Sequence, residues 1–227
     1  MIGPAGAAVD DVRRALALPN FDGAAAQRHM APINRPMARP DGAQALSPNG
    51  PRLSAVLLLL YDVDDELYLV LIRRPDYDGV HGGQVACPGG RHEPPESLGE
   101  TALRETCEEI GIRPAEVELL GKLTPLYVLP SDFEVHPFAG RYTGSGRPRF
   151  VPDPREVAAI LEVPLRVLLD PATRAEEMME VRDGLRMKVP FFRLDDHRAG
   201  HLVPHKVWGA TAMILGELVE RLRAAGS

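Results

Sequence analysis

The chain has 227 residues, of which 44% are hydrophobic and 26% are charged, and its formal net charge is −6. This length suits one domain with extensions or two small domains, and the acidic balance argues against broad binding to nucleic acid or anionic membranes. The two cysteines are too few for a disulfide framework, and neither a signal peptide nor an apolar run of transmembrane length is recognisable. We therefore expect a soluble, cytoplasmic protein with no membrane or nucleic-acid partner. The sequence leaves its oligomeric state open, a homodimer included.

Residues 1–50 are expected to form an N-terminal extension. A short helix is predicted over residues 10–18, with Asp10 or Asp11 as its cap. Recurring prolines follow, so residues 20–50 are expected to be irregular. A flap over a substrate or a dimer contact is the functional alternative for this segment.

The main domain is expected to span residues 51–227 and to begin with a β-hairpin. Two apolar runs, residues 53–61 and 67–72, flank a short acidic segment that is typical of a turn. The aspartates of that turn lack the glycine and the distal glutamate of a calcium loop, so a solvated turn is the better interpretation.

Arginines flank the glycine-rich segment that follows the hairpin. Arg73 and Arg74 precede this segment, and Arg91 follows it. Because arginine binds phosphate through two parallel hydrogen bonds, the arrangement indicates a polyanion site. Solvation of a strand edge is the alternative role for each arginine, and His81 is expected either to contact phosphate or to hold the loop.

A helix is predicted between Ser97 and Gly111. Ser97 and Glu100 have the spacing of a capping box, and Gly111 stands where a left-handed cap would end the helix. On a helical wheel, one side is predicted to be buried; it carries Leu98, Ala102, Leu103, Thr106, Cys107 and Ile110. Cys107 is thus expected to be a small core residue.

Three carboxylates on the other side of this helix suggest a metal site. Glu105, Glu108 and Glu109 are spaced i, i+3 and i+4, so they are predicted to converge. Mg²⁺ prefers oxygen ligands, and the carbonyl of Gly90, in a loop that can approach a ligand closely, could supply another. A solvated acidic face is the alternative when charge alone is considered.

The spacing of these residues resembles the Nudix box. The match comprises Gly90, Glu96, Arg104-Glu105, Glu108-Glu109 and Gly111, with Thr106 at a position where the family usually has an aliphatic residue. The resemblance implies hydrolysis of a nucleoside diphosphate linked to another group, with Mg²⁺ or Mn²⁺ as cofactor. It also implies an α/β fold, the Nudix α/β/α sandwich with a mixed, curved, mostly antiparallel sheet.

The same resemblance implies roles for these side chains. Glu105 and Glu109 would be principal metal ligands, with Glu108 assisting and the Gly90 carbonyl completing the set. Arg104 would form an ion pair with Glu96 that holds the loop and the helix together.

The segment before the box resembles the coenzyme A diphosphatase branch of the family. The matching residues are Arg74, His81, Gly83, Gln84, Val85, Ala86, Pro88, Gly89 and Gly90. Asp78-Gly79 replaces the usual Leu-Arg pair, and Cys87 replaces the usual aromatic residue. The resemblance implies that coenzyme A or a derivative is cut to 3′,5′-ADP and 4′-phosphopantetheine, with Arg74, His81, Gln84 and Arg91 as candidate substrate-binding residues. Another nucleoside diphosphate derivative such as ADP-ribose, or a non-catalytic Nudix-like binding module, remains an alternative.

After the helix, strands are predicted over residues 117–123 and 133–142, with a loop at 125–131 between them. Residues 144–154 are rich in glycine and proline and are expected to form a surface excursion. Glu156 follows in a segment that again resembles the branch. It is a candidate base or metal ligand from a loop opposite the helix, and the alternative is a solvated position.

The last third of the chain is expected to complete the fold. A short helix is predicted at 165–169, and a hairpin is predicted over 178–189 with its turn at Asp183-Gly184. Phe191-Phe192 should lie in strand core. Trp208-Gly209 resembles the opening of the final helix of the branch, which should extend to about Leu222 with Trp208, Ala212, Leu215 and Val219 buried.

Overall fold

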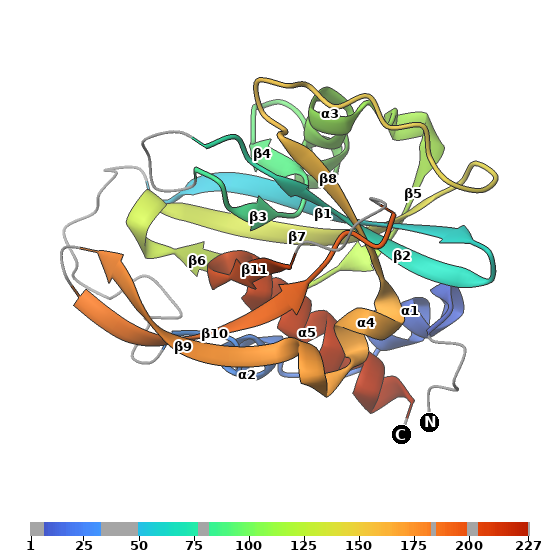
Figure 1. Cartoon of the computed structure of the whole chain (residues 1–227). Coiled ribbons are helices and arrows are strands. Elements are labelled where there is room, and N and C mark those ends of the chain that lie inside the picture. Colours follow the sequence, from blue (N-terminus) through green and yellow to red (C-terminus); the bar gives the residue numbers. More distant parts are fainter. Residues whose placement is uncertain (1–6, 33–49, 77–81, 183–184, 199–203, 227) are drawn as a thin grey trace.

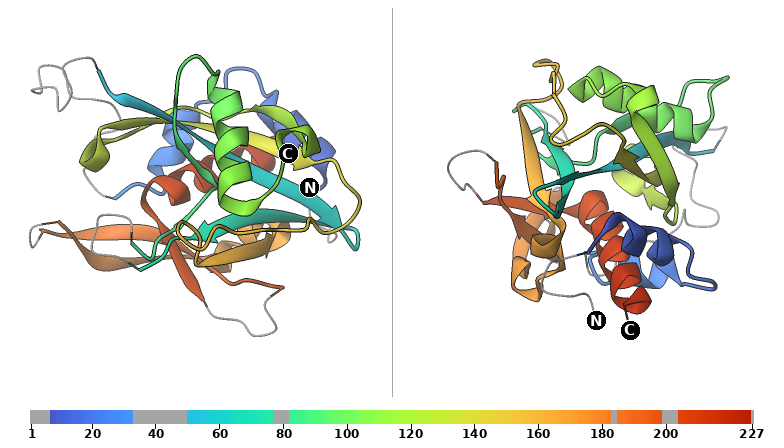
Figure 2. Two further views of the ribbon diagram at one scale, coloured as in Figure 1. Left: turned by 90° about the horizontal axis from the view of Figure 1, so that it is seen from above. Right: turned by 90° about the vertical axis from the view of Figure 1, so that its right-hand side faces the viewer.

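The structure, a computed structural model, describes residues 7–32, 50–76, 82–182, 185–198 and 204–226. A large mixed sheet forms the middle layer, with helix α3 on one face and helices α1, α2 and α5 on the other (Figure 1). The right-hand view of Figure 2 shows the same three layers from the side. The predicted α/β sandwich is therefore confirmed.

The large sheet has the strand order β3-β2-β1-β7-β5, and β4, β6 and β8 pair with β1, β7 and β2. Only the pairing of β1 with β7 is parallel among the described strands of this sheet. The strands are β1 (Arg52–Val63), β2 (Glu66–Arg73), β3 (Val85–Ala86), β4 (Gly89–Arg91), β5 (Val117–Lys122), β6 (Leu126–Val128), β7 (Phe133–Tyr142) and β8 (Ala159–Pro164).

The first hairpin forms as the sequence predicts. β1 and β2 pair in antiparallel register, and Asp64 and Asp65 at their turn have φ values of 55° and 59°, as tight hairpin turns require. β1 is apolar throughout its centre because both of its faces are covered: Leu57 packs toward α3, and Leu58 packs toward α5. This strand therefore joins the two halves of the core.

Helix α1 (Val9–Leu16) confirms the first predicted helix, but its cap differs from the prediction. Ala8 is the N-cap residue, and the Asp11 side chain, inside the first turn, accepts a hydrogen bond of 2.7 Å from the Ala8 amide. The prediction of irregular structure over 20–50 is wrong for α2 (Gly23–Arg28), where Asp22 caps a short alanine-rich helix that packs on α5. Residues 33–49 lie outside the described residues.

The C-terminal region adds a small sheet and a long helix. β9 (Arg174–Arg182), β10 (Leu185–Leu194) and β11 (His205–Trp208) pair in the order β11-β10-β9, which confirms the second hairpin, although its turn at 183–184 is not described. β11 was not predicted. Phe191 and Phe192 are buried in β10, as expected.

Two further helices complete this region. The predicted short helix is α4 (Leu165–Leu169), and the final helix is α5 (Gly209–Ala225). Ala212, Leu215 and Val219 are buried in α5, as predicted, whereas Trp208 is only half-buried because it caps the helix instead of lying inside it. No helix among the described residues is long and apolar enough to cross a membrane.

The region after α3 follows the prediction with one difference. The strands expected at 117–123 and 133–142 are β5 and β7. The loop expected at 125–131 instead contains β6, which pairs with β7, and a single 3₁₀ turn at Leu129–Ser131. The remaining 3₁₀ turns of the described chain are Pro114–Glu116 and Pro171–Thr173.

Candidate active site

The site is built on α3 (Leu98–Ile110), which lies across the sheet above β1 and β4 (Figures 1 and 2). Ser97 accepts a hydrogen bond from the Glu100 amide at 3.3 Å, and the Glu100 side chain accepts one from the Ser97 amide at 2.7 Å. At the other end, Gly111 adopts φ 78° and its amide donates to the Cys107 carbonyl. The predicted capping box and left-handed cap are thus both confirmed.

The burial of α3 differs from the helical wheel. Thr101, Thr106 and Ile110 are buried, but Cys107 is only half-buried and is not a core residue. Glu109, which the wheel places on the side opposite the buried face, has a side chain that is only 1% exposed. The wheel fails for Glu109 because Gly89 of β4 and a later loop at 151–153 both bond to the C-terminal end of the helix.

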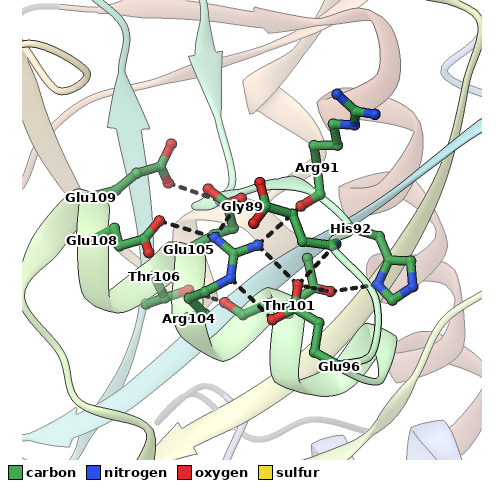
Figure 3. Close-up of polar contacts among 12 residues, drawn as sticks. Gly89, Arg91, His92, Glu96, Thr101, Arg104, Glu105, Thr106, Glu108 and Glu109 are labelled. Carbon is green, nitrogen blue, oxygen red and sulfur yellow. Dashed lines mark hydrogen bonds and ion pairs between the residues drawn. The ribbon is translucent and has the colours of Figure 1, made fainter.

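Arg104 lies at the centre of the polar cluster on α3 (Figure 3). Its Nε and Nη2 donate to the two oxygens of Glu96 at 3.0 and 2.9 Å, so the predicted ion pair is present and bidentate. Its Nη1 donates at 3.0 Å to both Glu105 and Glu108, and Nη2 also donates to the Arg91 carbonyl at 3.0 Å. These bonds raise the pKa of Arg104 and lower that of Glu96 to about 2, chiefly through their mutual hydrogen bonds.

The three glutamates do not form a single group. Glu108 is 57% exposed and turns toward Arg104, whereas Glu105 is 14% exposed and its carboxylate lies against the Cα atom of Gly90. A Cβ atom at position 90 would lie 2.4 Å from this carboxylate, so any side chain there would displace Glu105. Glu105 and Glu108 meet at Nη1 of Arg104, but no set of three such carboxylates converges on one point among the described residues, so the predicted convergence holds for two of the three.

Glu109 occupies the most enclosed position of the site. Its Oε2 accepts a hydrogen bond of 2.8 Å from the Gly89 amide, and its Oε1 lies 3.7 Å from Nη2 of Arg74. Burial raises the pKa of Glu109 to about 7, against the opposing effects of Gly89 and Arg74. Burial also raises the pKa of Glu105.

A later loop brings Glu156 to this end of the helix. The amides of Val151 and Asp153 donate to the carbonyls of Ile110 and Glu109 at 2.9 and 3.0 Å, so the loop satisfies the last turn of α3. Glu156 is exposed, and its charge contributes to the raised pKa values of both Glu105 and Glu109. The structure therefore brings Glu156 near the two enclosed carboxylates.

The glycine-rich segment contacts the same end of α3. Arg74 donates its amide to the Gln84 carbonyl at 2.9 Å, and its side chain faces Glu109. Arg73, in contrast, is engaged by Asp76 at 2.6 Å, and Asp76 packs against Gly83. His81 and Asp78-Gly79 lie outside the described residues.

The two other residues singled out around this segment have different environments. Arg91 projects away from the glutamate cluster and is exposed (Figure 3). Cys87 is buried, and burial raises the pKa of its thiol to about 12, so it is not a reactive thiolate.

The motif did not single out two polar residues that join the cluster. The Thr101 hydroxyl is 2.8 Å from Oε1 of Glu96 and 3.0 Å from Nδ1 of His92. Thr101 follows the capping box directly, and that position, one turn into the helix and facing the loop, is the only sequence signal that could have identified it.

The oxygen donors of this site fit a hard divalent cation. No group of three or more His, Cys, Asp or Glu side chains converges on one metal position in the described part of the chain. Mg²⁺, however, usually takes one or two carboxylates and completes its shell with substrate phosphates and water. Glu105 and Glu109 with the Gly90 carbonyl meet that requirement, and the burial that raises the pKa of both carboxyls is what a cation would offset.

Known proteins resemble this chain in sequence and fold. A family model described as NUDIX domain matches residues 51–182. Nudix hydrolase 15, mitochondrial, from Arabidopsis thaliana is 33% identical over 167 residues, which are 73% of this chain and 56% of that protein. The match therefore spans little more than half of that relative's length.

Two other relatives are matched over more of their length. Nudix hydrolase 3 from Caenorhabditis elegans is 32% identical over 177 residues, with 74% of this chain and 72% of the relative covered. Uncharacterized Nudix hydrolase NudL from Yersinia enterocolitica is 36% identical over 165 residues, with 68% and 73% covered. The crystal structure of a MutT/nudix family protein from Enterococcus faecalis superposes with a TM-score of 0.50 at 15% identity, over 96% of this chain and 75% of that one, which bears on the fold alone.

Proposed function

Because the chain belongs to the Nudix hydrolase family, we propose that it hydrolyses the pyrophosphate bond of coenzyme A or one of its derivatives. The products would be 3′,5′-ADP and 4′-phosphopantetheine or its acylated or oxidised form. One observation carries the proposal: Arg74, in the segment that resembles the coenzyme A branch, lies 3.7 Å from Glu109 of the Nudix box. The two motifs thus meet at one point of the fold.

The cofactor in this proposal is Mg²⁺ or Mn²⁺, held by Glu105, Glu109 and the Gly90 carbonyl, with Glu108 assisting. When bound, such an ion polarises a phosphoryl oxygen and lowers the pKa of a water molecule. Arg104 holds Glu105 against Gly90 through the 3.0 Å hydrogen bond, and the Gly89 amide fixes Glu109 at 2.8 Å. These residues keep two carboxylates in place before substrate arrives, which preorganises the site.

The remaining roles fall to residues around the enclosed carboxylates. Glu156, which follows the loop that binds the last turn of α3, is proposed as the base that takes the proton of the attacking water, or as an additional ligand. Arg74, Arg91, Gln84 and His81 are proposed to bind the substrate. Arginine at the phosphates would offset the negative charge that spreads over the phosphoryl oxygens during in-line attack.

The decisive experiment is a substrate panel with products identified by mass spectrometry. Coenzyme A, dephospho-coenzyme A, ADP-ribose, NADH and nucleoside triphosphates are compared at equal Mg²⁺ concentration. A charge-assisted contact to the 3′-phosphate contributes about 1.5–3 kcal/mol, so dephospho-coenzyme A should be hydrolysed roughly ten- to a hundredfold less efficiently. Equal efficiency would remove the 3′-phosphate argument, and a strong preference for ADP-ribose would overturn the coenzyme A assignment.

Two arginine variants, one at a proposed substrate contact and one as its control, test whether the site itself binds the substrate. Arg91→Ala should lower kcat/KM for coenzyme A, whereas Arg113→Ala should not, because Arg113, which follows the C-terminal cap of α3, is exposed and already paired with Glu116 at 3.0 Å. If both variants act alike, Arg91 is not a substrate contact.

A different nucleoside diphosphate derivative is the second candidate substrate. The ion pair of Arg73 with Asp76 favours this second candidate, because it occupies one of the arginines that were expected to bind the phosphates of coenzyme A. A non-catalytic Nudix-like module would show no turnover of any compound in the panel. A homodimer and a cytoplasmic location stay predictions, and one relative is named as mitochondrial.

A further inference from the structure

A chain of hydrogen bonds leads from the end of β4 to the enclosed carboxylate Glu105. The chain runs through His92, Thr101, Glu96 and Arg104, and every link is drawn in Figure 3. Thr101 is fully buried in the first turn of α3, where it meets both the helix and the loop that precedes it. Glu96, Arg104 and Glu105 are matched positions of the Nudix box, whereas His92 and Thr101 stand at positions that the motif leaves unspecified.

The donors around Thr101 define the direction of this chain. The hydroxyl lies 2.8 Å from Glu96 Oε1 and 3.2 Å from the Ser97 carbonyl oxygen. A carbonyl oxygen accepts hydrogen bonds and never donates them, and the same is true of the ionised Glu96 carboxylate. The hydroxyl has one hydrogen to donate, and the shorter contact is to the carboxylate. His92 Nδ1, at 3.0 Å, is therefore the donor to Thr101. Each bond in this series polarises the next toward Glu96.

Glu96 in turn fixes Arg104. Its Oε1 accepts from Thr101, from the Glu93 amide at 3.1 Å and from Arg104 Nη2 at 2.9 Å, so this oxygen has three donors. The planar guanidinium of Arg104 cannot turn without breaking its bidentate contact with Glu96, and its third nitrogen holds Glu105. A shift of Glu96 would thus move the carboxylate that lies beside Gly90.

We propose that Thr101 is a positioning residue of the active site, whose hydroxyl, oriented by His92, fixes Glu96 and through Arg104 the Glu105 carboxylate. The inference rests on the proposed function, since it assigns Thr101 a role in presenting a metal ligand. His92 adds an anchor on the sheet, because its amide donates to the Leu53 carbonyl of β1 at 3.0 Å. Thr101 therefore links the position of Glu105 to the central strand.

Helix α3 supplies a matched control. Thr106 is also fully buried on the same helix, but its hydroxyl donates to the Ala102 carbonyl at 2.7 Å and has no charged partner among the residues that the structure describes. Thr101→Val and Thr106→Val each replace a buried hydroxyl with a methyl of similar size. They differ in whether the lost hydroxyl belongs to the chain that ends at Glu105.

The experiment measures Mn²⁺ binding to the substrate-free protein by calorimetry, together with the Mg²⁺ concentration that gives half-maximal turnover. T101V should weaken Mn²⁺ binding about tenfold and raise the Mg²⁺ requirement in parallel, while T106V and the hydroxyl-retaining Thr101→Ser stay within about twofold of wild type. A purely structural role for Thr101 would lower the melting temperature of T101V and leave metal binding unchanged.

Equal Mn²⁺ affinity in T101V and T106V would overturn this inference and leave the proposed function intact. A wild-type protein that binds no Mn²⁺ would overturn the proposed metal site and this inference with it. If T101V does not fold, His92→Ala decides: it removes the donor to Thr101 from a half-buried position, should weaken Mn²⁺ binding about threefold, and would refute the inference if binding were unchanged.

Discussion

Replacement of Arg104 by alanine should lower the stability of the protein as well as its catalytic rate. The guanidinium makes a bidentate contact with Glu96 and single contacts with Glu105 and Glu108. Glu96 and Glu105 are only 17% and 14% exposed, so water cannot fully replace the lost donors. Glu108 is 57% exposed and should contribute little to the loss.

The size of the effect follows from these environments. Removing one partner of a buried ion pair costs about 3–5 kcal/mol, and the partial exposure of Arg104 places the expected loss near the lower limit, at about 3 kcal/mol. For a chain of this size, that loss corresponds to a melting temperature lower by about 6–12 °C.

The pH dependence gives the prediction a second signature. Hydrogen bonding to Arg104 lowers the folded-state pKa of Glu96 to about 2, below its ordinary value of 4.5. A lowered pKa contributes stability that is fully present above the ordinary value and is lost as the pH falls toward the folded-state value. The difference in stability between wild type and Arg104→Ala should therefore be constant above about pH 5 and should disappear between pH 4.5 and 2.

Calorimetry of the metal-free proteins across this range tests the reasoning. Arg113→Ala is the control, because Arg113 forms a similar ion pair with Glu116 but is 74% exposed, and its removal should leave the melting temperature near the wild-type value. An unchanged melting temperature for Arg104→Ala would show that the cluster contributes nothing to folding. If the difference in melting temperature between wild type and Arg104→Ala did not narrow in acid, Glu96 would not be the carboxylate that Arg104 stabilises.

Three other predictions follow from the same geometry. Glu109→Gln should retain the fold and lose a hundredfold or more in rate, which is about 3 kcal/mol of barrier, and exhaustive chelation should abolish turnover of the wild type; activity that persists without metal would contradict the mechanism. In the metal-free wild type, burial raises the pKa of Glu109 to about 7. A raised pKa contributes stability that is present below about pH 4.5 and is lost as the pH rises through 7. Urea titrations over that range should therefore show the unfolding free energy of wild type falling by about 3 kcal/mol relative to that of Glu109→Gln. Arg147→Ala should lower the unfolding free energy by about 2 kcal/mol, since it removes the bidentate partner, at 2.7–3.1 Å, of the buried Glu162. Tyr61 still donates to that carboxylate, which limits the loss. Equal stability of Arg147→Ala and wild type would show that water replaces the arginine.

Local signals predicted the frame of the site correctly. The caps of α3 and the ion pair of Arg104 with Glu96 follow from spacing within one short segment, so no distant part of the chain is needed to infer them. The hairpin of β1 and β2 was equally accessible, because apolar runs flank an acidic turn.

Distant contacts account for what the sequence did not predict. Glu109 is buried because Gly89 of β4 and the loop at 151–153 enclose the end of α3, and neither neighbour is visible in the helical period. The short elements α2 and β6 exist because α5 and β7 provide surfaces for them, and their own propensities are weak signals over so few residues.

The distribution of charge around α3 explains how an acidic protein could accept a polyanion. The formal net charge is −6, so the local placement of arginines decides whether phosphate can approach. Arg73 is neutralised by Asp76, and Arg104 by its glutamates, but Arg74 lies 3.7 Å from Glu109, too far for a hydrogen bond. A cation beside Glu109 would compete with Arg74 for the same carboxylate. In the proposed function, metal binding would therefore free Arg74 for substrate phosphate, so that the same ion would neutralise the acidic end of the helix and release a phosphate-binding side chain.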